Sequence, residues 1–440
     1  MALRKRMKSY IHATVATLGI LLVAGPVQSV AADSPTSYIG SNLGSYYSNL
    51  PSPDVLWSNT MDTPPPYYRM GDGVITVGDG KVYAIQKGQL LAINVQSGTI
   101  MWKYGSKLTA PLLYQDGIVY ISSEAGTLYA VNAASGKNKW TSSVNSKDAK
   151  LLVVNKDQLF VSNGDIGAYN LKNGQFQWRD QLSEKLFDQI KVEDDLILAQ
   201  NEVSGAYSYN VLHAFDRYSG KQLWDSSRHD LPIASQAGTL LSQREPTLLD
   251  HLPVTTLDTL DAKTGKVIKT VEYNPTNLDT AAVKESLNSG GKAWIGGDRI
   301  YIHGNRSVYS YPLNVDPAKA TKEYYSIAEN MDYAAGPYDG RVLFSNGTAI
   351  YGVKTANKSL VTYSGLNNSI ARFDLLGHGM YVAQSDGSLT AINLITAAPV
   401  LNINLTSRSF GPTILENGII IVQGERNLVA FKEPTALRMN

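Results

Sequence analysis

The sequence predicts an all-β protein folded as a closed β-propeller, and two observations carry that prediction. The phrase Ala-x-Asn/Asp-x-x-Ser/Asn-Gly-x-x-x-Trp recurs along the chain and ends at Trp102, Trp140, Trp178 and Trp224. These tryptophans lie 38 to 46 residues apart, and the stretches between them are rich in β-branched and aromatic residues and are separated by turn-forming glycines. A β-rich repeat of this length is typical of blades that stack around a central axis.

Each repeat can be written as four strands, and the second repeat shows them in order. Residues 111–114 form a short apolar first strand, and an Asp-Gly turn leads to a second strand at 118–121. A third strand follows at 127–131, and a Ser-Gly turn leads to a fourth strand that carries Trp140. Apolar or alternating runs bounded by turn residues predict buried and half-buried strands.

Counting the repeats gives the number of blades. Second strands are predicted near Val82, Ile118, Leu159, Leu196, Leu240, Ile300, Val342, Met380 and Ile419. The count is therefore nine, although eight is the commoner ring size and the irregular fifth unit is the one in question. In that unit Lys269 stands where a tryptophan is expected, and later units have Tyr324 or Leu401 there.

The two ends of the repeat region complement each other. The last unit stops after a third strand at 428–431, while residues 55–57, with Trp57, look like a fourth strand that has no unit of its own. An N-terminal strand that completes the last blade closes the ring and covers two sheet edges. We expect one propeller domain over residues 54–432, followed by a tail at 433–440.

The repeat resembles the tryptophan-docking repeat of the pyrroloquinoline-quinone (PQQ) propeller superfamily. The resemblance covers the whole repeat region and implies that each tryptophan packs against the neighbouring blade. The docking residues would be Trp57, Trp102, Trp140, Trp178 and Trp224. Within the superfamily, this sequence resembles the non-catalytic scaffold branch more closely than the quinoprotein dehydrogenases. The scaffold branch includes the propeller lipoprotein of the outer-membrane β-barrel assembly machinery.

The dehydrogenase branch remains the first alternative. The resemblance to it implies PQQ and calcium over the central channel, a catalytic Asp, a calcium-binding Glu and Asn, and often a disulfide between adjacent cysteines. This chain has no cysteine, and no motif places a catalytic Asp. We therefore predict no cofactor, and PQQ with calcium belongs to this alternative alone.

The N-terminal region predicts export. Arg4, Lys5, Arg6 and Lys8 precede an apolar run at 11–25, and small residues at 30–32 predict cleavage before Asp33. Residues 1–32 would be a signal peptide, with an uncleaved anchor as the alternative, and 33–53 a flexible linker. Without cysteine the protein has no disulfide and is not a lipoprotein, so we expect it to be secreted, wall-associated or periplasmic.

Charge and histidine spacing exclude other classes. Removing the signal leaves 35 basic and 38 acidic residues, a net charge of −3. Such a chain is not typical of nucleic-acid binding, and we expect no stable membrane insertion after cleavage. The histidines left after cleavage do not pair at metal-ligand spacing, so no metal site is predicted. A monomer is expected.

Long connections gather on one face of the predicted ring. Residues 201–210, 225–232, 243–253 and 274–292 are B–C or D–A connections of units four to six, which lie on the same face; we name these four connections the crown. Functional residues usually lie on loops held by a rigid scaffold, although insertions without a role are equally compatible with this pattern. The candidate binding residues are Tyr207, Tyr209, Arg228, His229, Asp230, Arg244, Glu245, Asp250 and His251.

The sequence thus favours an exported, non-enzymatic scaffold that binds a protein or a cell-envelope polysaccharide through the crown. A quinoprotein oxidoreductase is the first alternative, and a carbohydrate-active enzyme that uses the Arg, His and Asp residues of the crown is the second. No catalytic residue is assigned.

Overall fold

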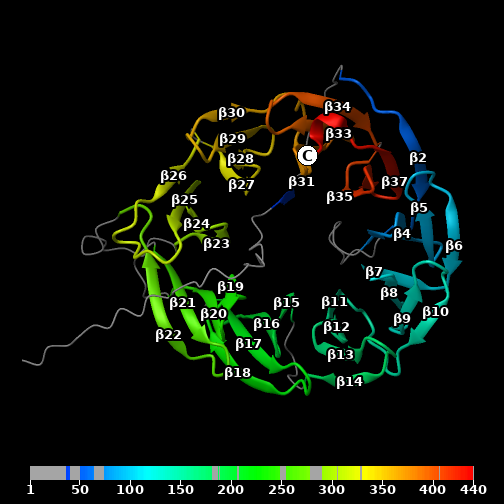
Figure 1. Cartoon of the computed structure of the whole chain (residues 1–440), viewed down its shortest axis with the longest axis horizontal. Helices are drawn as coiled ribbons and strands as arrows, with labels where there is room; N and C mark the ends of the chain where they lie inside the picture. Colours follow the sequence, from blue (N-terminus) through cyan, green and yellow to red (C-terminus); the bar gives the residue numbers. More distant parts are fainter. Residues whose placement is uncertain are drawn as a thin grey trace, which may run out of the picture.

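The computed structural model describes residues 36–39, 50–63, 74–180, 187, 189–205, 208–247, 254–277, 290–304, 306–327, 330–405 and 407–439. These residues form nine antiparallel sheets that stand as blades around a ring (Figure 1). The first strand of each blade lies nearest the centre and the fourth lies on the outer rim. The nine-bladed propeller predicted from the repeat count is confirmed.

The first three blades follow the sequence repeat most regularly. Blade 1 contains β3 (Thr76–Gly78), β4 (Lys81–Gln86), β5 (Gln89–Asn94) and β6 (Ile100–Tyr104). Blade 2 contains β7 (Leu108–Gln115), β8 (Ile118–Ser123), β9 (Leu128–Asn132) and β10 (Asn138–Thr141). Blade 3 contains β11 (Leu151–Asn155), β12 (Gln158–Ser162), β13 (Ile166–Asn170) and β14 (Phe176–Arg179).

The next three blades carry the long connections. Blade 4 contains β15 (Gln189–Glu193), β16 (Leu196–Val203), β17 (Tyr209–Asp216) and β18 (Gln222–Ser227). Blade 5 contains β19 (Ala234–Gln236), β20 (Thr239–Arg244), β21 (Thr255–Asp261) and β22 (Val267–Tyr273). Blade 6 contains β23 (Lys292–Gly296), β24 (Arg299–Gly304), β25 (Ser307–Pro312) and β26 (Glu323–Tyr325).

The last three blades complete the ring. Blade 7 contains β27 (Asp332–Tyr338), β28 (Arg341–Ser345), β29 (Ile350–Lys354) and β30 (Leu360–Thr362). Blade 8 contains β31 (Ile370–Leu376), β32 (Gly379–Gln384), β33 (Ser388–Asn393) and β34 (Pro399–Asn404), with β1 (Ser37–Ile39) added to β31. Blade 9 contains β35 (Phe410–Glu416), β36 (Ile419–Gly424) and β37 (Asn427–Lys432), followed by the short 3-10 helix η1 (Thr435–Leu437).

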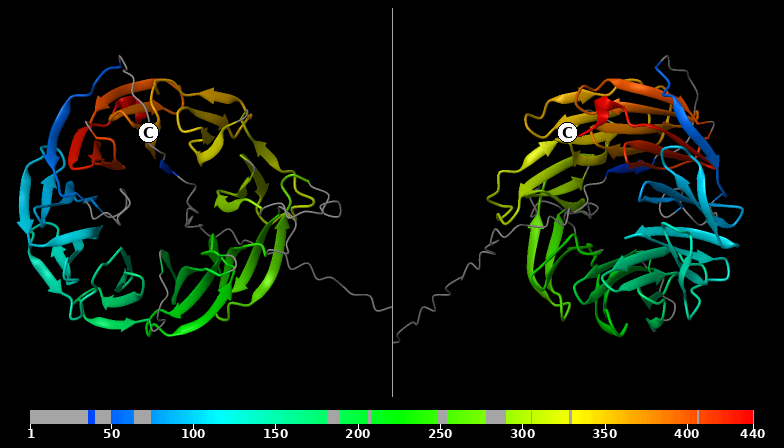
Figure 2. Two further views of the ribbon diagram at one scale, coloured as in Figure 1. Left: turned by 180° about the vertical axis from the view of Figure 1, so that it is seen from behind. Right: turned by 45° about the vertical axis from the view of Figure 1, so that its right-hand side comes forward.

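The ring closes as predicted. Strand β2 (Val55–Thr60) pairs with β37 and serves as the fourth strand of blade 9, with Trp57 opposite Ala430. The indole Nε1 of Trp57 then donates to the carbonyl of Val95 in blade 1 at 2.8 Å. Residues from the two ends of the chain therefore build one blade, and that blade docks on the first (Figure 2).

Five tryptophans share one docking geometry. Each lies on a fourth strand and donates its indole N–H, at 2.8 to 3.1 Å, to a carbonyl in the third-to-fourth-strand turn of the next blade. The pairs are Trp57 with Val95, Trp102 with Ala133, Trp140 with Leu171, Trp178 with Arg217 and Trp224 with Ala262. The glycine of each turn has a positive φ, and a Cβ there would collide with the indole. The predicted docking role is confirmed.

The core is divided among the joins between blades. Each of the nine joins holds a cluster of buried apolar side chains drawn from the two neighbouring blades. Joins without a docking tryptophan use other contacts, such as the Lys358 Nζ of blade 7 placed 4.2 Å from the ring centroid of Tyr325 in blade 6. In the described part of the chain, no helix has the length and apolar character needed to cross a bilayer.

The segments outside the propeller are described only in part. The expected signal peptide, 1–32, lies outside the described residues. The expected linker, 33–53, contains β1. In the tail, Leu437 of η1 is fully buried and its carbonyl accepts the N–H of His378 at 2.7 Å.

Candidate functional site

The predicted crown is built largely from strand ends. In blade 4 the strands β16 and β17 continue to Val203 and back from Tyr209, so half of the expected loop at 201–210 belongs to a paired hairpin. Strand β18 continues to Ser227 and β20 to Arg244. The connections are therefore shorter than the sequence suggested, because their residues pair with one another.

Residues 228–230 tie blade 4 to blade 5. Three backbone hydrogen bonds form the tie: Arg228 N–H donates to Asn210 O (2.6 Å), Glu245 N–H to Arg228 O (2.7 Å) and Asp230 N–H to Gln243 O (3.0 Å). The first bond extends the β17–β18 ladder, and the other two run along the end of β20. A segment bonded on both sides holds the two blades in one fixed relation at this face.

Arg228 is held in an unfavourable backbone conformation. Its φ is +65°, in the left-handed region that non-glycine residues seldom occupy. Its guanidinium carbon lies 5.7 Å from the ring centroid of Tyr209, within the range of a cation–π contact. Strain of this kind persists only where the surroundings impose it, and it is concentrated at functional sites. Here the hydrogen bonds to the N–H and the carbonyl of Arg228 hold its backbone in this conformation.

A His–Asp–Arg cluster lies beneath the tie, with His229 and Asp258 buried and the Arg244 side chain 38% exposed. Nε2 of His229 is 3.0 Å and Nε of Arg244 is 2.8 Å from Oδ2 of Asp258 in β21. His229 is 4% and Asp258 1% exposed, and the Ser226 hydroxyl lies 2.9 Å from Nδ1 of His229. Burial acts to raise the pKa of Asp258, but hydrogen bonds from His229 and Thr270 and the charge of Arg244 hold it below its usual value.

Two carboxylates share one amide at the surface of the same region. The Asn210 side-chain nitrogen donates to Asp230 (2.7 Å) and to Glu245 (2.9 Å), and the Asn210 backbone N–H donates to the second oxygen of Glu245 (2.7 Å). Burial raises the pKa of Glu245, the nearby Asp230 adds to that rise, and the Asn210 N–H opposes it. The pair gives the crown an acidic area at the tie.

The structure thus brings together six of the nine predicted residues: Tyr209, Arg228, His229, Asp230, Arg244 and Glu245. Tyr207, Asp250 and His251 lie outside the described residues. Asp258, at the centre of the buried cluster, was not predicted. Its signal is visible in the sequence, since it is a carboxylate inside the strand Thr-Thr-Leu-Asp-Thr-Leu, where an unpaired charge would be costly.

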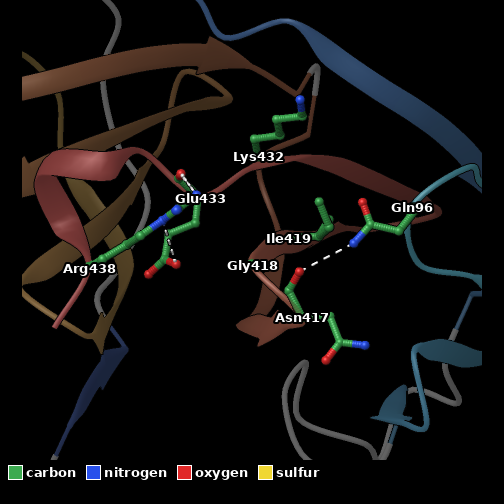
Figure 3. Close-up of a pocket in the computed structure, with 7 residues that line it drawn as sticks. All are labelled: Gln96, Asn417, Gly418, Ile419, Lys432, Glu433 and Arg438. Carbon is green, nitrogen blue, oxygen red and sulfur yellow. Dashed lines mark hydrogen bonds and ion pairs between the residues drawn. The ribbon is translucent and has the colours of Figure 1, made fainter. Parts of the chain in front are cut away.

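A hollow of about 460 Å³ lies on the face of the ring opposite the crown, between blade 9 and blade 1 (Figure 3). It is lined by Gln96, Asn417, Gly418, Ile419, Lys432, Glu433 and Arg438. Arg438 pairs with Glu433 at 3.4 Å on one side, and the Gln96 amide donates to the Asn417 carbonyl on the other. These two contacts draw polar groups of the hollow into bonds with each other, and the larger hydrogen-bonded network of the crown makes it the better-built candidate site.

The dehydrogenase alternative requires side chains that bind calcium beside PQQ. Calcium is bound by several carboxylate and carbonyl oxygens that converge on one point. Among the described residues, no three His, Cys, Asp or Glu side chains gather in a way that could hold a metal ion. Within the described chain, the residues present do not fit the calcium site that would accompany PQQ.

A family model matches two overlapping stretches of the chain, residues 49–187 and 148–330, and its description is outer membrane protein assembly factor BamB. The chain belongs to this family. The matched stretches run from the closing strand β2 into blade 6 and include all five docking tryptophans. The predicted PQQ-like propeller is thereby confirmed, and the family model is that of the BamB branch.

Solved structures with a similar fold are remote in sequence. The computationally designed Ika8 protein is 10% identical over 85% of this chain and 98% of its own, with a TM-score of 0.46. BamB from Moraxella catarrhalis is 15% identical over 86% and 99%, at 0.44. A europium-containing methanol dehydrogenase is 14% identical over 84% of each chain, at 0.43. Likeness at this level says nothing about ligand or activity. No curated protein matches the chain.

Proposed function

We propose that this propeller is an exported, non-enzymatic scaffold that holds a protein partner at the crown. The observation that carries the proposal is the tie at residues 228–230, which fixes two blades and their surface groups in one arrangement. Binding costs less when the contact groups are already ordered before the partner arrives. A rigid tie on a strained backbone is therefore the kind of feature that a binding face requires.

The chemistry of the crown supports a protein as the partner. Tyrosine and arginine are enriched among the residues that dominate protein interfaces, and Arg228 lies within cation–π distance of Tyr209 here. The carboxylates of Asp230 and Glu245, which share the Asn210 amide, belong to the same crown and provide charges of the opposite sign. A partner that places an acidic group on Arg228 and a basic group on these carboxylates would be positioned in one orientation.

Family membership supports the same choice. The family is described as an assembly factor for outer membrane proteins, which favours a protein over a polysaccharide. The sequence has no cysteine to which a lipid could be attached.

A photo-crosslinking amino acid at Tyr209 tests the location. Residues 33–440 carrying p-benzoylphenylalanine at position 209, incubated with the envelope fraction of the producing cells, should yield a defined adduct with one protein. The matched control is Tyr218, which is 56% exposed and lies in the turn after β17, on the face opposite the crown. An adduct formed at position 218 and not at 209 would place the partner on the other face.

A substitution at Arg228 tests the chemistry. Arg228→Asn removes the guanidinium but retains a residue that tolerates positive φ, so the fold should be kept while partner affinity falls at least tenfold, as for an interface hot spot. Lys156→Asn is the control, because Lys156 is an exposed basic residue at φ +51° on the face opposite the crown. Surface plasmon resonance with the captured partner should show no change for this control. Equal loss in both variants would argue against the crown.

A further inference from the structure

Strand β1 lies inside the ring. It pairs antiparallel with β31, the innermost strand of blade 8, with Ser37 opposite Asp374 and Ile39 opposite Arg372. In Figure 1 it is the short blue strand in the interior of the ring beside β31. Blade 8 therefore has five strands, whereas each of the other eight sheets has four.

The composition of the inner strands explains why β31 accepts a partner. Three other inner strands are as long or longer, β7, β27 and β35, and they contain Pro111, Pro337 and Pro412 respectively. The remaining inner strands have only three to five residues. Proline and short length are the usual means by which exposed sheet edges avoid pairing with other chains. Strand β31 has seven residues and no proline, so its edge is open to pairing.

The present occupant uses only part of that edge. Strand β1 pairs with three of the seven residues of β31. Outside the ladder, Leu375 N–H donates to the carbonyl of Thr36 at 3.0 Å, and the Ser37 hydroxyl donates to Asp374 at 2.9 Å. Thr36 and Ser37 are themselves exposed. A strand of three residues makes few main-chain hydrogen bonds to offset the entropy lost on ordering it.

Asp374 is fixed independently of β1. Its carboxylate accepts Nη2 of Arg372 at 2.8 Å, and its second oxygen accepts the backbone N–H of Thr413 in blade 9 at 2.8 Å. The oxygen that meets Ser37 is therefore held in place by groups of the propeller itself. It is a ready acceptor for a hydroxyl group on any strand laid along β31.

We propose that the inner edge of β31 is an acceptor site for an extended polypeptide strand. Strand β1 occupies it in cis, and a longer extended segment of a partner protein, with Ser or Thr opposite Asp374, displaces β1. This mode of recognition relies on main-chain hydrogen bonds, with one side-chain contact setting the register. The site lies inside the ring and is separate from the crown, so it stands whether or not the crown binds a partner.

The test uses a fluorescent peptide with the sequence of residues 34–42, which is long enough to pair along the whole of β31. The protein is the chain 33–440 with Tyr38→Pro, which removes a backbone N–H from the middle of β1 and frees the edge. By fluorescence anisotropy, the peptide should bind this variant at least tenfold more tightly than the unmodified chain. A second variant, Ser37→Asp, places two carboxylates opposite each other and should release β1 in the same way.

Two further peptides separate strand pairing from other binding. N-methylation of the Tyr38 amide keeps every side chain but removes a ladder donor, and it should abolish binding. A Ser37→Ala peptide should bind several-fold more weakly, because Asp374 loses the hydroxyl group. Hydrogen exchange should show new protection confined to residues 370–376. Failure of both folded variants to bind the peptide at millimolar concentration, or equal binding of the N-methylated peptide, would overturn the proposal.

Discussion

Replacing Trp178 with alanine should lower the free energy of unfolding by about 3–5 kcal/mol, the usual cost of truncating a buried aromatic residue. Trp178 is 6% exposed, and its indole donates to the carbonyl of Arg217 in the next blade. The indole also fills the space beside Gly220, where no side chain fits. Its removal would leave a cavity at the join of blades 3 and 4. Urea denaturation followed by circular dichroism measures the loss.

The control for this prediction is the same position in another blade. Lys269 lies on β22 opposite Thr259, as Trp178 lies on β14 opposite Ala168. Lys269 is exposed, so Lys269→Ala should cost less than about 1 kcal/mol. Equal losses from the two substitutions would contradict the view that docking tryptophans, rather than fourth strands in general, hold the ring together.

The regular half of the ring could be predicted because its joins repeat one local phrase. Tryptophan, turn glycine and acceptor carbonyl recur at fixed spacing, so one blade predicts the next. The irregular half replaces that phrase with unique contacts. Lys358, for example, occupies the turn position where glycine is expected, with φ +62°, and its ammonium contacts Tyr325 and Glu323 of the preceding blade. A contact that occurs in only one join does not recur along the sequence, so it cannot be predicted from the repeat.

The candidate site was predictable in place but not in structure. Counting the connections located the crown, because every B–C and D–A connection of a propeller lies on one face. The count of connections could not show that Arg228 and Asp230 would join two blades by backbone hydrogen bonds. Those bonds depend on how blades 4 and 5 pack against each other. Strand β1 was missed for the same reason. Residues 37–39 have no partner nearby in the sequence, and β31 lies more than three hundred residues away.

Asp258→Asn should destabilise the protein by about 3 kcal/mol at neutral pH, at the lower end of the cost of breaking a buried ion pair. The carboxylate is almost fully buried and accepts contacts from His229 and Arg244 on one oxygen. Asparagine keeps the shape but not the charge, so the buried part of Arg244 loses its counter-ion. Because His229 anchors the tie between blades 4 and 5, hydrogen exchange should also quicken at residues 228–230.

The dependence of stability on pH provides the sharper test of this pair. The folded state holds the pKa of Asp258 below its usual value, so the unfolded chain binds its proton first as the pH falls. The stabilisation is therefore present above about pH 4, the ordinary range for aspartate, and is lost as the pH falls towards the lowered pKa. Asp258→Asn should flatten this acid-side decline in thermal midpoint. Asp261→Asn, on the same strand but at an exposed turn, should leave most of it in place, and the reverse order would show that the turn rather than the buried cluster governs acid sensitivity.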